Sequence, residues 1–344
     1  MLSLIRELDR AEMETGDFQT AERMCDNLLK SNQEDEDVLR AKLFCLLQQY
    51  KWSESLALAS RIEAGFEKAY CLYRLNRFED AIKVIESEKV HDDRTTHLRA
   101  QILYRQEKYE DAVKEYDRIL GTQGDDADAE ICTNAIAASS MANRNDSSLK
   151  SILSVASKVP EKRHELLYNV GTASIRAGDY TTARKYLCKA RDTCAEAYDE
   201  EEDEKEEMED ERSIVDVQLA YVEQRKGNLD AALKAYEAVL KQRPSDKTVA
   251  AVASNNIVTI HGDKDLFDSY RKAKVALNVE SKLTSDQREI MTFNFCLLLL
   301  KMGRLKEARD LIRKFPDLTV NKDRVSVLEI ALLVCCLFLS LCVL

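Results

Sequence analysis

A short pattern recurs along the chain and constrains its fold more than any other feature. A turn residue and a polar residue precede an aromatic side chain or Leu, and a small side chain follows three residues later. The pattern occupies residues 16–21, 50–55, 76–81, 107–112, 178–183, 227–232 and 303–308. Its aromatic or Leu positions are Phe18, Trp52, Phe78, Tyr109, Tyr180, Leu229 and Leu305.

The spacing of these positions predicts the fold. The gap from Phe18 to Trp52 equals the tetratricopeptide period of about 34 residues. The next two gaps are shortened versions of the same period. We therefore predict an all-α, right-handed superhelical solenoid of helix-turn-helix units.

Each position of the pattern has a physical role in such a hairpin. The turn residue, often Gly, supplies the backbone freedom needed where the first helix gives way to the second. The aromatic side chain or Leu anchors the second helix against the first. The small residue, usually Ala, lies where the two helices approach most closely, because a larger side chain would force them apart.

The longer gaps indicate irregular parts of the same array. The gap from Tyr109 to Tyr180 is about two periods and predicts a degenerate repeat around residues 135–156. The gap from Leu229 to Leu305 leaves room for another around residues 249–276. The gap between Tyr180 and Leu229 exceeds one period by about the length of an acidic run, which we interpret as an insertion. We therefore expect about nine units in one cooperative array over residues 1–320.

The acidic run, residues 199–211, holds eleven acidic side chains and one lysine. It carries −10 of the net charge of −11, so the rest of the chain is nearly neutral. We expect it to be a solvated loop, and a role in attracting a basic partner is the alternative. Nothing in the chain supplies the basic stripe that the phosphates of RNA or DNA would require.

The cysteines and the chain breakers agree with a helical protein of a reducing compartment. The chain has only three prolines and nine glycines. Its ten cysteines form no CxxC pair and no Cys/His cluster at metal-ligand spacing along the sequence. Cysteines such as Cys25, Cys45, Cys71, Cys188 and Cys296 stand singly in apolar helical stretches, where a reduced thiol behaves as a small hydrophobe. We therefore expect a cytoplasmic protein.

The first helices of the hairpins are expected to line a concave groove for a protein partner. Arginine recurs two residues before the turn in four repeats, and tyrosine or phenylalanine recurs beside it. Such a surface suits a peptide that carries carboxylates, since Arg binds carboxylates in a fork and Tyr offers rigid contact area. The alternative is that these arginines only bridge neighbouring repeats. The predicted groove residues are Arg40, Phe44, Phe66, Tyr70, Tyr73, Arg74, His97, Gln101, Tyr104, Arg105, Tyr168, Arg176, Tyr221 and Arg225.

Two features limit the kind of partner and site. Chaperone-type tetratricopeptide domains bind a terminal carboxylate with Lys and Asn at positions that here hold other residues, such as Arg40 and Phe44. This argues against a chaperone-binding clamp. The chain has no P-loop, GxGxxG, GxSxG or HExxH motif, so we predict no enzyme activity, no cofactor and no metal. His97 falls at a groove position, but a lone histidine is more often a packing residue.

Several stretches resemble the family of the seventy-two-kilodalton subunit of the signal recognition particle. FEKAYCLYRLNRFEDAIKVIES at residues 66–87 is similar to a repeat region of that family. HELLYN at 164–169 and NNIVTIHGDKDLFDS at 255–269 follow in the same order, then Lys282-Leu283 and Phe293-Asn294. The resemblance covers roughly residues 1–320 and includes the acidic run.

The resemblance implies a scaffold subunit in the targeting of nascent proteins to the endoplasmic reticulum. In this family the repeats bind the sixty-eight-kilodalton subunit, and the particle RNA is bound by a lysine-rich segment beyond the repeats. That segment is not in this sequence, so the resemblance implies only indirect contact with RNA. It transfers no contact residues, because no short motif of the family marks them.

The last part of the sequence, residues 325–344, is strongly apolar, and the stretch 330–344 carries no charge. Its length is the least that spans a bilayer, so a tail anchor is one interpretation. The other is the first helix of a further repeat followed by an altered or truncated end. The sequence of the tail thus does not decide whether the protein contacts a membrane. The alternative to the scaffold subunit is a tail-anchored adaptor or co-chaperone at an organelle membrane.

Overall fold

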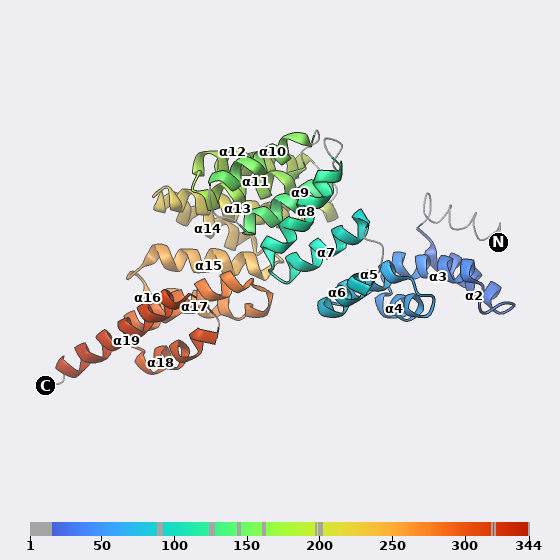
Figure 1. Ribbon diagram of the computed structural model, residues 1–344. Helices are drawn as coiled ribbons and strands as arrows, with labels where there is room; N and C mark the ends of the chain where they lie inside the picture. The colour runs from blue at the N-terminus through green and yellow to red at the C-terminus, as the bar shows by residue number, and fades with distance from the viewer. Residues whose placement is uncertain are drawn as a thin grey trace. The chain divides into compact units, whose positions relative to one another are not determined.

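The computed structural model describes residues 16–87, 92–123, 128–142, 146–159, 163–196, 198, 202–317, 319 and 321–342. Parts of the predicted architecture lie outside these ranges, among them residues 1–15 of the array, 143–145 of the degenerate repeat, 199–201 of the acidic run and 343–344 of the tail. The described residues are almost entirely helical (Figure 1). The fold is an all-α array of tetratricopeptide-type hairpins, as the sequence predicts.

The chain forms two compact units, residues 1–142 and 143–344, where the sequence predicts one array. The first unit contains α2 (Phe18–Leu29), α3 (Glu36–Gln48), α4 (Trp52–Arg61), α5 (Gly65–Arg74), α6 (Phe78–Ser87), α7 (Asp93–Arg105), α8 (Tyr109–Gln123) and α9 (Ala129–Ala142). The division falls inside the predicted degenerate repeat 135–156. Its two helices belong to different units, because α9 packs on α8 and the following helix packs on α11.

The second unit continues the hairpins to the end of the described chain. It contains α10 (Asp146–Lys158), α11 (His164–Ala177), α12 (Tyr180–Glu196), α13 (Glu202–Arg225), α14 (Leu229–Gln242), α15 (Lys247–His261), α16 (Leu266–Leu277), η3 (Glu280–Lys282), α17 (Ser285–Lys301), α18 (Leu305–Lys314), η4 (Phe315–Asp317) and α19 (Lys322–Cys342). In both units each helix packs on its neighbours in sequence (Figure 1). First helices of successive hairpins also touch, as α5 touches α7 and α13 touches α15, so they share a face.

All seven copies of the sequence pattern adopt the same local structure. The turn residue has a positive φ, from 58° at Asn76 to 87° at Gly227, even where it is Tyr50 or Glu107. The second helix begins two residues later, at the aromatic side chain or Leu. The small residue three positions on is fully buried at every copy, with Ser55 replacing Ala in one of them. The left-handed turn therefore sets the point at which each second helix begins.

The irregular segment 249–276 forms the hairpin of α15 and α16. Its turn contains two residues with positive φ, Gly262 and Asp265. The second helix begins at Leu266, and Ser269, three positions later, is fully buried. The anchor and the small residue therefore keep their spacing here. Sequence reasoning missed this copy because the turn is longer.

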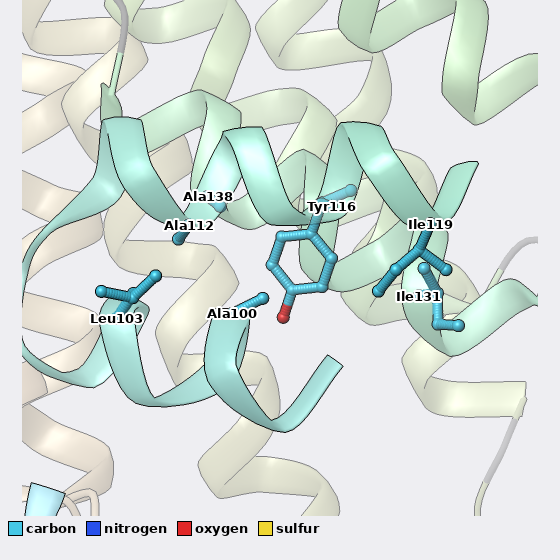
Figure 2. Close-up of a cluster of buried hydrophobic side chains, with 8 residues drawn as sticks. Ala100, Leu103, Ala112, Tyr116, Ile119, Ile131 and Ala138 are labelled. Carbon is cyan, nitrogen blue, oxygen red and sulfur yellow. The ribbon is translucent and has the colours of Figure 1, made fainter. Parts of the chain in front are cut away.

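Buried aromatic side chains join the hairpins within each unit. In the first unit Tyr116 of α8 lies among side chains of α7 and α9, including Leu103 and Ile131 (Figure 2). In the second unit Tyr236 of α14 takes the same place, seven positions after its anchor, and its hydroxyl donates to Gln224 Oε1 at 2.9 Å. Burial raises the pKa of both phenols. Each tyrosine fills the space between one hairpin and the next.

The acidic run is a helix over its described part, not the predicted loop. Helix α13 begins at Glu202 and includes the rest of the run. Glu and Lys are good helix formers, and acidic side chains are favoured in the first turn of a helix. The helix is fixed further on by the buried side chains of Val215 and Val217. Glu206, Glu207 and Glu209 are exposed to solvent, as expected for a charged surface.

The apolar tail forms α19 and packs against α17 and α18. Leu328 is fully buried in a cluster with Leu299, Ile312 and Phe315, and Arg324 pairs with Glu289. Helix α19 thus contacts both helices of the preceding hairpin. In the part of the chain that the structure describes, no helix has the length and apolar character needed to cross a membrane. Ile330, Leu333 and Val334 on the other side of α19 are exposed.

Candidate partner-binding surface

Three of the four arginines before the turns lie over aromatic rings of the preceding hairpin. The guanidinium carbon of Arg74 is 4.3 Å from the ring centroid of Trp52. The corresponding distances are 5.7 Å from Arg105 to Phe78 and 5.8 Å from Arg225 to Tyr180. Each ring is the anchor that begins a second helix. A cation over an aromatic face is attracted by the ring quadrupole, so these arginines bridge neighbouring repeats.

Two of these arginines also bind a tyrosine on their own helix. Arg74 Nη1 donates to the hydroxyl of Tyr70 at 3.0 Å, and Arg225 Nη1 donates to that of Tyr221 at 3.2 Å. The hydrogen bond with Tyr221 raises the pKa of Arg225. Each pair is separated by four positions, about one turn of helix. The same arrangement thus occurs once in each unit, and both arginines remain exposed.

The predicted groove residues of α5 form one aromatic cluster with the anchors on either side. Tyr70 packs edge-on against Trp52 at 5.8 Å and stacks on Phe66 at 6.4 Å. Tyr73 continues the cluster from Tyr70 to Phe78. Arg94 of α7 lies 4.2 Å above the ring of Phe66. We call Trp52, Phe66, Tyr70, Tyr73 and Phe78, with Arg74 and Arg94, the aromatic–arginine surface. Each of its rings is partly exposed, and both arginines are exposed.

His97 and Gln101 lie together in the first unit and are held by packing. The two side chains are 3.2 Å apart, and Asn134 of α9 lies 3.4 Å from the same ring nitrogen of His97. The imidazole ring also packs edge-on against Tyr116 at 5.9 Å. Burial lowers the pKa of His97. His97 therefore joins α7 to α9, which agrees with a packing histidine.

The other predicted groove residues are dispersed through the two units. Arg40 forms an exposed ion pair with Glu36 at 2.7 Å on its own helix. Phe44 packs edge-on against Phe18 at 5.8 Å, and Tyr104 packs against Tyr109 at 5.4 Å. Tyr168 is partly buried against the cluster around Leu187, and Arg176 is partly buried near the end of α11.

The second unit contains a pocket that sequence reasoning missed. It has a volume of about 170 Å³ and lies between α13, α15 and α17. Four carboxamide side chains line it beside Tyr221 and four apolar residues. The full lining is Val217, Gln218, Tyr221, Val252, Asn255, Asn256, Gln287, Ile290 and Met291. We call this the amide pocket. Its signal in the sequence is the Asn255-Asn256 pair, which opens the resembling stretch 255–269 but carries neither charge nor an aromatic ring.

Hydrogen bonds hold the asparagines of the amide pocket in place. Asn294 of α17 donates to Asn255 Oδ1 at 3.0 Å, and Asn256 donates to the hydroxyl of Tyr236 at 3.0 Å. The carboxamides of Gln218 and Gln287 also line the pocket. A carboxamide offers both donors and an acceptor, which an ionised Lys, Arg, Asp or Glu side chain does not. The pocket is thus suited to groups that both donate and accept, such as a peptide backbone.

Comparison with known proteins shows which repeats these resemble. A family model of TPR-like repeats, SRP_TPR_like, matches residues 25–141, and a tetratricopeptide repeat model matches residues 217–251. The signal recognition particle subunit SRP72 of dog and that of human are each 34% identical over 306 residues, 86% of this chain. SRP72 of Dictyostelium discoideum is 28% identical over 326 residues, 90% of the chain.

The repeats of this chain are similar to those of the SRP72 subunits over most of the chain. The chain spans about half the length of these relatives, 45% of the dog and human proteins and 48% of the Dictyostelium protein. Among solved structures, NprR in complex with its cognate peptide NprX has a TM-score of 0.53 at 16% identity, covering 79% of this chain and 83% of that one. A human IFIT1 dimer with m7Gppp-AAAA has a TM-score of 0.51 at 12% identity, covering 82% of this chain and 68% of that one. These two likenesses show the fold alone.

Proposed function

We propose that this chain is a scaffold subunit of the signal recognition particle that acts in cotranslational protein targeting to the endoplasmic reticulum. The match to SRP72 over 86% of the chain carries this proposal. The scaffold works by holding a protein partner rather than by catalysis. It acts in the cytoplasm, with contact to the endoplasmic reticulum through the particle.

The partner in this proposal is the sixty-eight-kilodalton subunit of the particle. The aromatic–arginine surface supports binding of a segment with acidic and apolar side chains. Arg74 lies 4.3 Å from the ring centroid of Trp52, and Arg94 lies 4.2 Å from that of Phe66. Their guanidinium edges are thereby held in place for a carboxylate. The rings beside them supply rigid contact area of the kind found at binding hot spots.

The amide pocket supports a second contact of the same partner, to its main chain. Asn255 is oriented by Asn294, and Asn256 is oriented by Tyr236. Little side-chain freedom is then lost on binding, which favours affinity. The particle RNA is reached indirectly in this proposal, through the partner and through other parts of the assembled particle.

Co-purification tests the proposal. The chain and the sixty-eight-kilodalton subunit of the same organism are expressed together, and a tag on the chain is used to recover both under native conditions. We expect a stoichiometric complex that persists through gel filtration. Recovery of the folded chain alone, with the partner soluble in the same lysate, would contradict the proposal.

A further inference from the structure

Three side chains that are far apart in the sequence meet in the second unit. His164 is the first residue of α11, Cys194 lies near the end of α12, and Glu211 lies in the acidic part of α13. His164 Nε2 is 2.8 Å from Glu211 Oε2, and Cys194 Sγ is 3.8 Å from the same oxygen. The three candidate ligand atoms all lie within 4.8 Å of one another.

We propose that His164, Cys194 and Glu211 bind one zinc ion. An imidazole nitrogen, a thiolate and a carboxylate are the three ligand types of zinc in proteins, and tetrahedral zinc places them about 2.0–2.3 Å from the metal. Nitrogen and oxygen ligands at those distances are separated by about 3.3 Å, so the imidazole and the carboxylate need to part by only about half an ångström. A water molecule completes the four-coordinate shell.

A second carboxylate lies beside the histidine ligand. Glu165 Oε2 lies 3.6 Å from Nδ1 of His164, the ring nitrogen that faces away from the site. A carboxylate beside the second nitrogen of a metal-bound histidine fixes the ring orientation and strengthens the ligand.

The Cys194 side chain is fully buried beside the Glu211 carboxylate. Zinc binds the thiolate, so binding releases the thiol proton to solvent. The Glu211 side chain is 43% exposed, which leaves a route by which the ion can enter.

Zinc at this place would fasten the acidic start of α13 to the hairpin of α11 and α12. In the structure, Glu211 contacts that hairpin through the ion pair with His164 and the 3.8 Å contact with Cys194 Sγ. A ligand that binds the folded chain stabilises it by mass action. The proposed zinc therefore has a structural role and is independent of partner binding.

Cobalt(II) serves as the spectroscopic probe of the site in the purified full chain. We expect one equivalent of Co²⁺ to produce a thiolate-to-metal charge-transfer band and tetrahedral d–d bands, and one equivalent of Zn²⁺ to abolish them. The bands should disappear in Cys194→Ser. His164→Gln, which keeps a donor toward Glu211, should weaken binding at least tenfold. Circular dichroism checks that each variant is folded.

The matched control is Cys188→Ser, since Cys188 lies on the same helix as Cys194 and outside the site. This variant should keep the bands, and Zn²⁺ should raise the melting temperature of the wild type and of Cys188→Ser alike. Absence of the charge-transfer band in the wild type, or its survival in Cys194→Ser, would overturn the proposal. Octahedral Co²⁺ spectra without a thiolate band would show adventitious binding by the acidic run. That result would also overturn the proposal.

Discussion

The guanidinium carbon of Arg74 lies 4.3 Å from the ring centroid of Trp52, across the boundary between two hairpins. Arg105 and Arg225 repeat the relationship with Phe78 and Tyr180. A residue that the sequence suggests for partner binding therefore also joins one repeat to the next. Loss of such an arginine has two separable effects, on the stability of its unit and on binding.

Replacement of Arg74 by Ala is expected to destabilise the first unit. A cation–π contact at an exposed site contributes about 0.5–1 kcal/mol, so the free energy of unfolding should fall by about that amount. Urea denaturation followed by circular dichroism measures it. Arg118→Ala is the control, because the Arg118 side chain is 64% exposed and pairs only with Glu115 of its own helix among the contacts described. Equal losses in the two variants would contradict a bridging role for Arg74.

Replacement of Gly171 by Ala is expected to destabilise the second unit. A Cβ atom at Gly171 would lie 2.7 Å from Leu187 Cγ, and Leu187 is fully buried. Overpacking of this kind costs about 1–3 kcal/mol. Thermal and urea unfolding measure the change.

Gly121→Ala is the matched control for that variant. Gly121 lies in α8, has no positive φ, and a Cβ atom there would meet nothing within 4 Å. Because Ala is favoured over Gly inside a helix by about 0.5–1 kcal/mol, this change should stabilise the protein. A loss of stability in Gly121→Ala as large as that in Gly171→Ala would contradict the close approach of α11 and α12.

Replacement of Tyr236 by Phe is expected to disturb the amide pocket. The Tyr236 hydroxyl donates to Gln224 and accepts from Asn256, so the variant leaves both carboxamides without that contact. Both hydrogen bonds are partly buried, and a typical hydrogen bond contributes about 0.5–1.5 kcal/mol to stability. Unfolding measurements give the cost, and binding of the sixty-eight-kilodalton subunit should weaken because Asn256 is no longer oriented. If both stability and affinity were unchanged, the hydrogen bonds of the Tyr236 hydroxyl would have no role in holding the amide pocket.

The stability of the first unit should depend on pH through His97. Its pKa is lowered by burial, so at mildly acidic pH the unfolded chain binds a proton that the folded chain does not. This makes stability fall as the pH drops below about 6.5, the ordinary pKa of His, and has no effect above it. His97→Gln should therefore show a smaller loss of stability between pH 7.5 and 5.5 than the wild type, measured by urea unfolding at each pH. Identical losses would contradict the assignment to His97.

Local patterns in the sequence determined the hairpins. A left-handed turn, an anchor and a small residue act within a few positions of one another, so they can be read from the chain directly. All seven predicted anchors begin a helix and all seven small residues are buried. The helical acidic run escaped this reasoning because exposed charge is compatible with a loop or with a helix that is fixed further along.

Only the tertiary structure decided which side chains meet. Whether Arg74 lies over Trp52, or Asn294 orients Asn255, depends on how one hairpin packs on the next, and no spacing in the sequence states that. His164, Cys194 and Glu211 show the same limit more strongly. Their separations in the sequence are far from any metal-ligand spacing, and it is the packing of three helices that brings them together.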